Sequence, residues 1–315
     1  MSVFLKSADN NSKRQSGCYD TKGNPFMLAP FKEWAERINI KKRLVLEPFA
    51  GANNIVRHLH KLHFTSYDIH PRDAKVRQRD TIRDFPKGYE VVITNPPWLA
   101  KNSAKRRGLF FPKTQHDDLY KHCLELCLRN CNYIAALIPA TFLQSRLFRE
   151  RLEVFIVLHD RNMFSETDNP VALALFGDEV KTTKIYYDDQ FIGELDALEK
   201  HLPRSNYTSK IRFNDPFGEL GFVAFDNTSE PTIRFCQGEE LAQYHIKQST
   251  RMITRIDVGR KVDDDIIISL NRSIDHFRKR TFDIFLTPFK GMRKDGMYRR
   301  RMDYTLARRL ISKHM

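Results

Sequence analysis

The most distinctive turn in the sequence is Asn95-Pro96-Pro97-Trp98, which directly follows the apolar run EVVIT. Such a run predicts a strand buried on both faces of a parallel sheet. Ligands bind open sheets of this kind beyond the carboxyl ends of the strands. The two prolines stiffen the turn and so fix its carbonyl groups and side chains. Prolines that only end the strand are the alternative interpretation, but the residues upstream favour a ligand site.

A second candidate site begins at Glu47, where a predicted strand ends in an acid and a glycine-containing turn, Pro48-Phe49-Ala50-Gly51, leads into a helix. This arrangement suits a nucleoside-like cofactor that approaches the backbone closely. It lacks the G-x-G-x-x-G pattern, so NAD is disfavoured. The next strand ends at Asp68, the position of an acid that holds ribose hydroxyls in such folds. Asp80-Thr81-Ile82 then precedes the strand that leads to Asn95.

Short β-rich runs alternate with amphipathic stretches through the first part of the chain. This alternation is typical of a parallel sheet with crossover helices, and so of an α/β fold. Strands are expected at residues 43–47, 64–69, 90–94 and 133–138, and helices at 53–62, 118–129 and 142–150. The runs 154–158 and 171–176 are expected to close the sheet as an antiparallel pair.

The charge of the chain is unusually positive for a globular protein of 315 residues. Its 53 Lys and Arg against 39 Asp and Glu give a net charge of +14 and a pI near 9.6. Residues 241–315 hold 18 Lys or Arg and 8 Asp or Glu, so this segment supplies +10 of the total. Nucleic acid is the commonest partner of such a charge, although a membrane surface would also attract it.

Neither a membrane span nor a disulfide framework is expected. No apolar run approaches the roughly 20 residues that span a bilayer, and the polar N-terminus has no signal-peptide core, so we expect a soluble, cytoplasmic protein. Cys123, Cys127 and Cys131 recur on one face of a predicted helix and are interpreted as small core residues. No metal site is expected, because further His or Cys partners are not evident nearby.

Taken in order, these motifs resemble the amino-group DNA methyltransferases, specifically the gamma-class N6-adenine enzymes of type II restriction-modification systems. The resemblance covers roughly residues 14–178. It implies a seven-stranded Rossmann-like S-adenosylmethionine-dependent methyltransferase fold in residues 1–180. Residues 181–315 would form a C-terminal α+β target-recognition region that binds DNA. A separate restriction endonuclease is the partner enzyme that such a system implies.

The resemblance also implies roles for individual residues in binding S-adenosyl-L-methionine. The N-terminal motif around its methionine end would contain Gly17, Tyr19 and Thr21, and the turn beneath it Glu47, Pro48, Phe49 and Gly51. Asp68 would take the ribose hydroxyls, Ile69 would pack on the cofactor adenine, and Asp80, followed by Thr81, would accept from the adenine amine. The second glycine of the family's turn is Asn53 here, and asparagine tolerates left-handed backbone angles better than most residues.

For the target base, the resemblance assigns catalysis to Asn95, Pro96, Pro97 and Trp98, with Asn95 and Pro97 also bordering the cofactor. The base amine is hidden in the duplex, so the nucleotide must be flipped out, at a cost of a few kcal/mol. Stacking on Trp98 on one face and Phe164 on the other could offset about 1–3 kcal/mol of that cost. The Asn95 oxygen and the Pro96 carbonyl would accept both amine hydrogens, so positioning and electrostatics do most of the work.

The candidate DNA contacts are two sets of cations. Residues 101–113 carry five basic residues and no acid, and a DNA-contacting loop is favoured there over a merely solvated one. In the C-terminal third, basic and aromatic residues interleave, which favours phosphate binding over a solvated face. The predicted DNA-binding residues are Lys101, Lys105, Arg106, Arg107, Arg278, Lys279, Arg280, Arg293, Lys294, Arg299, Arg300 and Arg301.

Three alternatives stay open at this point. An N4-cytosine methyltransferase would share the fold, but those enzymes usually have Ser where this chain has Asn95. An RNA or protein-glutamine methyltransferase also carries the N-P-P-aromatic turn, although it would not need the long basic C-terminus. A DNA-binding module without catalysis would not need Asp68, Asp80 and Asn95 near the ends of successive strands.

Overall fold

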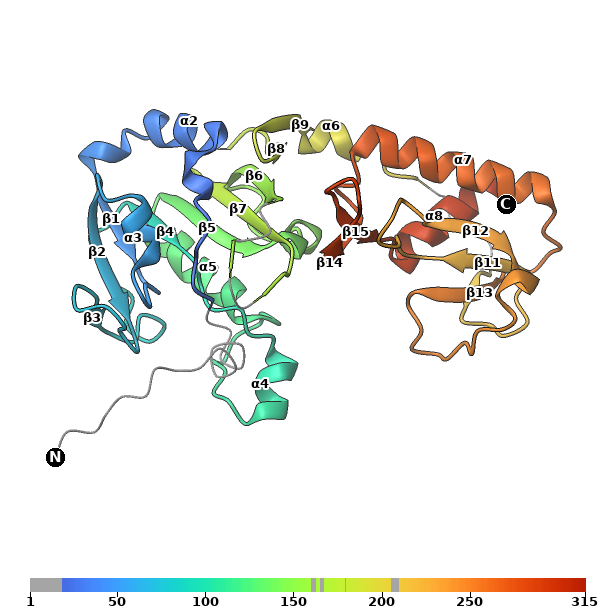
Figure 1. The fold of residues 1–315 in the computed structure, drawn as a ribbon, viewed down its shortest axis with the longest axis horizontal. Coiled ribbons are helices and arrows are strands. Elements are labelled where there is room, and N and C mark those ends of the chain that lie inside the picture. Colours follow the sequence, from blue (N-terminus) through green and yellow to red (C-terminus); the bar gives the residue numbers. More distant parts are fainter. Residues whose placement is uncertain (1–18, 160–162, 165–166, 179, 205–209) are drawn as a thin grey trace. The chain divides into compact units, whose positions relative to one another are not determined.

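The computed structural model describes residues 19–159, 163–164, 167–178, 180–204 and 210–315. The chain divides into two compact units (Figure 1): unit 1 is Met1–Phe142 with Arg146–Ile192, and unit 2 is Leu143–Ser145 with Gly193–Met315. The division falls at residue 192, later than the expected 180. The sequence changes texture near 180, but two further strands still add to the first sheet beyond that point.

Unit 1 is built on a nine-stranded sheet in the order β3-β2-β1-β4-β5-β7-β6-β8-β9. The strands from β3 to β5 pair in parallel, while β7 lies antiparallel between β5 and β6. The α/β class and the antiparallel pair are therefore confirmed. The strands are β1 Leu44–Glu47, β2 His63–Asp68, β3 Arg77–Gln78, β4 Val91–Thr94, β5 Tyr133–Pro139, β6 Leu152–Leu158, β7 Val171–Phe176, β8 Lys184–Tyr187 and β9 Gln190–Glu194.

The expected count of seven strands is wrong for this sheet. The first seven strands of the chain occupy seven adjacent positions, and β8 and β9 extend the edge formed by β6. The centre is almost wholly apolar: every residue of β4 and of β7 is buried. Burial on both faces explains why these strands read as continuous apolar runs in the sequence.

The helices of unit 1 are mostly short. They are η1 Pro25–Met27, α2 Ala29–Arg37, η2 Ile40–Lys42, α3 Asn54–His58, α4 Lys101–Arg107, α5 Leu119–Asn130 and the 3-10 turn η3 Ala140–Ser145. In α5 the Asp118 side chain caps the first turn, and Cys123 and Cys127 are buried, as the core interpretation predicted. A helix over 142–150 was wrong, because Arg146 and Phe148 adopt positive φ angles of 57° and 55°, which no α-helix continues through.

An excursion of the chain, residues 100–118, leaves the sheet after the Asn95 turn and returns to the start of α5. Ala100 and Asp118 form an antiparallel bridge at its base, and the Leu119 amide donates to the Leu99 carbonyl at 3.0 Å. Within it, α4 projects away from the sheet (Figure 1). The first half of the segment predicted as a loop is therefore helical.

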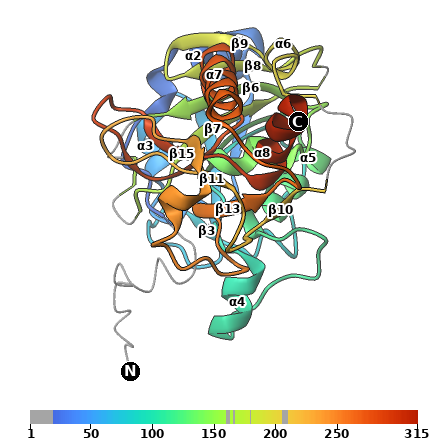
Figure 2. The same cartoon turned by 90° about the vertical axis from the view of Figure 1, so that its right-hand side faces the viewer.

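Unit 2 combines helices with antiparallel strands. Its four-stranded sheet has the order β10-β13-β11-β12, and a separate hairpin joins β14 to β15. Figure 2 views α7 nearly end-on, beside the strands of this unit. The strands are β10 Arg212–Phe213, β11 Leu220–Val223, β12 Arg234–Gln237, β13 Ile253–Asp257, β14 Thr287–Met292 and β15 Tyr298–Arg301, and the helices α6 Leu195–Glu199, η4 Gly238–Leu241, α7 Asp264–Thr281 and α8 Tyr304–His314.

Unit 2 has its own core. The apolar face of α7, with Leu270, Ile274 and Phe277, packs with Leu306 and Leu310 of α8. Asp263 and Asp303 cap the two helices by accepting from backbone amides, which stabilises each helix start by roughly 1 kcal/mol. Across the described ranges of both units, no helix is long and apolar enough to cross a membrane.

Candidate active site and cationic residues

Asn95 lies at the carboxyl end of β4 and its amide is held in one orientation. Its Nδ2 donates to the Tyr19 carbonyl at 2.8 Å and to the Thr21 hydroxyl at 3.3 Å. Its Oδ1 is buried and has no hydrogen-bond partner among the described residues. The N-terminal segment therefore uses the donor side of the amide and leaves the acceptor side for a ligand.

The aromatic residues of the site pack on one another. Trp98 is only 7% exposed, and its indole N–H donates to the Leu137 carbonyl of β5 at 3.3 Å. The Trp98 and Phe164 rings meet edge to face, 5.2 Å apart at 90°, and Tyr19 contacts both. The two rings contact each other directly, so the predicted stacking of a base between Trp98 and Phe164 stays a prediction that requires the rings to separate.

The turn after β1 has the strained geometry that its sequence predicted. Gly51 has a φ of 51°, and Asn53 is left-handed at φ 62° and ψ 28°, so asparagine does replace the glycine there. The Gly51 amide donates to Asp68 Oδ2 at 2.8 Å. A Cβ on Gly51 would lie 2.8 Å from an Arg72 guanidinium nitrogen, so Arg72 would have to shift, and the positive φ would strain any other residue at this position.

Glu47 is buried beneath this turn. Its Oε1 accepts from the Thr94 hydroxyl at 2.7 Å and from the Phe49 amide at 3.1 Å, whereas Oε2 has no partner among the described residues. Burial raises the pKa of Glu47 from 4.5 to about 8, despite the hydrogen bond from Thr94. Glu47 is therefore mostly protonated at neutral pH and can act as donor or acceptor at Oε2.

Asp68 and Ile69 lie at the carboxyl end of β2, next to β1. Each oxygen of Asp68 accepts one backbone N–H, from Gly51 and from His70, and so keeps lone-pair capacity. The Ile69 side chain is 50% exposed beside it. An acceptor pair next to an exposed aliphatic side chain suits a sugar and the face of a base.

Thr81 supports the turn after β1, whereas Asp80 caps the residues that directly follow it. The Thr81 hydroxyl is buried and donates to the Pro48 carbonyl at 2.8 Å. Asp80 Oδ1 accepts from the amides of Ile82 and Arg83 at 3.2 Å each. Thr81 thus supports the turn from behind, while the carboxylate of Asp80 is half-buried.

The structure brings most of the predicted residues together at the carboxyl ends of β2, β1 and β4, because these three strands are neighbours and all run parallel. Gly17 lies outside the described residues. Sequence reasoning missed Asp20, which forms a two-bond ion pair with Arg72 across the Gly51 turn. The partners are far apart in the chain, and no local pattern marks them.

The predicted DNA-binding cations fall into two groups. The first group lies on α4 and is exposed: Lys101, Lys105, Arg106 and Arg107. The second group lies in unit 2. There Lys279, Arg280 and Lys294 are exposed, and Arg299 and Arg301 are half-buried. Arg278, Arg293 and Arg300 are buried. Assigning these three to phosphate contacts was wrong, because the first two pair with buried carboxylates and Arg300 is 1% exposed.

Within the described residues, no group of three His, Cys, Asp or Glu could hold a metal ion.

No protein-family model matches the sequence, and no curated protein matches it. Solved structures that resemble part of the chain include the type I restriction-modification methyltransferase subunit from Streptococcus thermophilus. That likeness has 14% identity over 53% of this chain and 48% of the subunit, with a TM-score of 0.36. A protein of a type I restriction-modification system matches at 16% identity over 57% of this chain and 45% of its own, with a TM-score of 0.39.

The type IIG restriction endonuclease BpuSI matches at 14% identity over 55% of this chain and 28% of the endonuclease, with a TM-score of 0.39. This chain thus spans less than half the length of each of these three proteins. Likeness of this degree assigns neither a family nor a function.

Proposed function

We propose that this chain is a methyltransferase that uses S-adenosyl-L-methionine to methylate the N6 amine of adenine in DNA. The observation that carries the proposal is the Asn95 amide, with its donor side anchored and a buried oxygen left without a partner among the described residues. An orphaned buried acceptor costs about 1–3 kcal/mol. A ligand that donates an N–H, as a base amine does, removes that cost.

The residues at the turn fit the proposed cofactor. The left-handed Gly51 and Asn53 keep side chains away from the turn, and Asp68 retains acceptor capacity for two ribose hydroxyls. Ile69 is exposed where an adenine ring would pack. When bound, S-adenosylmethionine supplies a methyl group on a sulfonium sulfur, which is a strong electrophile.

The chemistry assigned to the chain is positioning. Asn95 Oδ1 and the Pro96 carbonyl accept the two hydrogens of the amine, which draws its nitrogen toward tetrahedral geometry and directs the lone pair at the methyl carbon. With S-adenosylmethionine bound, transfer would form an N–C bond as the S–C bond breaks, and the amine nitrogen would then lose one proton to solvent. Asn95, in place of the Ser typical of N4-cytosine enzymes, favours adenine.

DNA is proposed as the substrate because of where the exposed cations lie. The basic helix α4 belongs to the excursion that begins just after Trp98, so one loop links the Asn95 site to a charged surface. Such a surface suits the phosphates around a flipped nucleotide. Unit 2 would recognise the target sequence, and host DNA would be protected from a separate restriction endonuclease.

The test is to express the wild-type chain and an Asn95→Ala variant in cells whose DNA lacks N6-methyladenine. Nucleosides from hydrolysed DNA and, separately, RNA are analysed by mass spectrometry. We expect N6-methyladenine in DNA only, and only with the wild-type chain. A mark in RNA, or N4-methylcytosine in DNA, would replace the proposed substrate, and no mark in either would contradict the proposal.

A further inference from the structure

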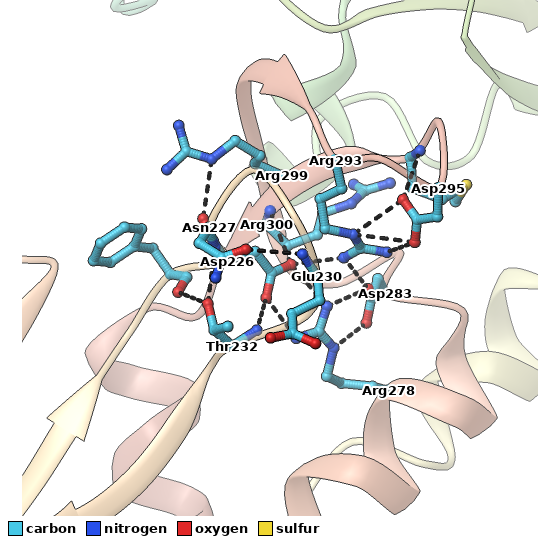
Figure 3. Close-up of polar contacts among 12 residues, drawn as sticks. Asp226, Asn227, Glu230, Thr232, Arg278, Asp283, Arg293, Asp295, Arg299 and Arg300 are labelled. Atoms are coloured by element: carbon cyan, nitrogen blue, oxygen red, sulfur yellow. Dashed lines mark hydrogen bonds and ion pairs between the residues drawn. The ribbon is translucent and has the colours of Figure 1, made fainter.

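The most heavily bonded buried group of unit 2 is Asp226, which is 0% exposed (Figure 3). Arg278 donates to both of its oxygens at 2.7 and 2.8 Å, and Arg293 donates to Oδ2 at 2.7 Å. Arg278 also binds Asp283, and Arg293 binds Asp295. We call these five residues the Asp226 cluster. Burial alone would raise the pKa of Asp226, but the bonds from Arg278 lower it overall, so the carboxylate is charged.

The Asp226 cluster fixes the β14–β15 hairpin. Asp226 follows β11, Arg278 is near the end of α7, and Arg293 begins the hairpin turn. The backbone adds two bonds, from the Asp226 amide to the Arg300 carbonyl at 2.9 Å and from the Lys294 amide to the Thr228 carbonyl at 3.0 Å. Breaking a buried ion pair is strongly unfavourable, so the hairpin has one position relative to α7.

Arg299, on β15, is bound differently from the arginines of the cluster. Its Nε donates to the Asp226 carbonyl at 3.0 Å, and its guanidinium lies over the Phe289 ring, 4.5 Å from the centroid, and near Phe225 at 5.8 Å. Its two Nη groups make no hydrogen bond or ion pair with any described residue. In Figure 3 they point away from the Asp226 cluster.

We propose that Arg299 reads a guanine in the DNA target by donating from its two Nη groups to the O6 and N7 atoms of the base. This inference rests on the proposed function for its partner, DNA. A planar guanidinium matches two adjacent acceptors, and guanine presents such a pair in the major groove. A two-stranded ribbon such as β14–β15 fits that groove. Because Arg299 is already oriented, binding loses little side-chain entropy.

A phosphate also offers two acceptors, so the experiment must separate base from backbone. Labelled fragments of one plasmid are made by polymerase reaction with either guanine or 7-deazaguanine, which lacks the N7 acceptor. Binding of the wild-type chain, Arg299→Lys and Arg299→Ala to both fragments is measured by fluorescence anisotropy over a range of salt concentrations. Lys261→Ala, an exposed cation outside the hairpin, is the control for loss of charge.

The wild-type chain and Lys261→Ala should bind the guanine fragment about tenfold more tightly than the 7-deazaguanine fragment. Arg299→Ala should largely lose this preference, and so should Arg299→Lys, which keeps the charge but not the planar fork. Thermal unfolding of Arg299→Lys checks that the hairpin remains folded. An unchanged preference in both variants would overturn the proposal. So would a preference that persists while the salt slope falls by about one, because that marks a phosphate contact.

Methylation of the same fragments separates this inference from the function on which it rests. If the wild-type chain prefers guanine through Arg299 but leaves no methyl mark, only the proposed function fails. If it methylates DNA and both Arg299 variants keep the same target sequence, only the reading role fails. Sequencing that detects modified bases should show the target of Arg299→Ala relaxed at one guanine position.

Discussion

The Asn95 site of unit 1 and the Asp226 cluster of unit 2 each hold a polar side chain through groups distant in the sequence, but they satisfy its buried acceptor oxygens to different extents. Asp226 accepts five hydrogen bonds, from Thr232, Arg278, Arg293 and Arg300. Asn95 is anchored only through Nδ2, and its Oδ1 is left without a partner among the described residues. The bonds of the Asp226 carboxylate are complete and hold the fold together, whereas the Asn95 amide is fixed on one side and has an acceptor available to a ligand on the other.

Arg299 extends this comparison within unit 2. Its Nε donates to the Asp226 carbonyl, whereas Arg278 and Arg293 donate to the Asp226 carboxylate. Its two Nη groups have no partner among the described residues, as the oxygen of Asn95 has none. Charge alone does not separate it from Arg278 or Arg293. The distinction lies in which of its donors already have partners. Four predictions carry the comparison further, three in unit 1 and one in unit 2.

The largest effect is expected from Asn95→Ala. Loss of the orphaned acceptor should lower methyl transfer by about a hundredfold or more, while binding of S-adenosylmethionine, measured calorimetrically, stays near wild type. Asn130→Ala is the control, because Asn130 ends α5 and its side chain donates to the Leu126 carbonyl of the same helix, away from the Asn95 turn in the sequence. Retained transfer in Asn95→Ala would remove the distinction drawn between complete and incomplete groups.

Asp226→Ala should destabilise unit 2 by about 3–5 kcal/mol, because Arg278 and Arg293 would keep buried charges without their shared partner. Asp257→Ala removes a partner of Arg212 at a more exposed position, and should cost less than about 1 kcal/mol. Denaturant unfolding measures both. Equal losses would mean that the Asp226 cluster is no stronger than a surface ion pair.

Replacing Lys101, Lys105, Arg106 and Arg107 of α4 with Ala should weaken DNA binding and flatten its salt dependence. Each lost phosphate contact reduces the slope by about 0.9. The matched control removes four exposed lysines that precede β1, β2 and β4 at the opposite edge of the sheet: Lys41, Lys42, Lys61 and Lys87. If both quadruple variants lose the same slope, α4 makes no special contact.

A pH-dependent effect is expected at Glu47, whose folded-state pKa of about 8 exceeds the ordinary 4.5. The folded chain therefore holds a proton that the unfolded chain releases. The contribution of this proton to the free energy of unfolding is complete below pH 4.5. It declines as the pH rises toward 8, by up to about 1.4 kcal/mol per pH unit. Glu47→Gln should remove this slope in thermal unfolding, whereas Glu33→Gln, exposed on α2, should keep it. A slope that survives in Glu47→Gln would place the proton elsewhere.

The sequence was most informative where local pattern and tertiary role coincide. Buried parallel strands such as β4 must be apolar throughout, and the left-handed turn demands Gly51 and tolerates few residues other than asparagine at Asn53. Both could therefore be predicted. The turn after β4 could be placed at the ligand edge for the same reason.

Roles set by distant partners could not be predicted. Arg278 and Arg299 stand in equally basic runs, but only the fold brings Asp226 to the first and leaves the second with a free edge. The contact of Trp98 with Phe164 likewise depends on distant partners, since Tyr19 contacts both rings and Thr21 bridges to Phe164. The helix expected at 142–150 failed because positive φ angles at Arg146 and Phe148 leave no signature in those residue types.

Because Ala100 and Asp118 are bridged, the excursion that carries α4 is closed at its base, so much of it can be replaced as one segment. Its two ends lie side by side, but Ala104 within it is buried and packs with Leu119 and Cys123 of α5, so only its exposed part can change in length and charge without disturbing α5. Doubling the length of a flexible loop raises the free-energy cost of closing it by only about 0.6 kcal/mol. A different exposed segment grafted between Leu99 and Leu119, with Ala104 retained, could therefore change the charge of this surface while leaving the Asn95 amide where it is.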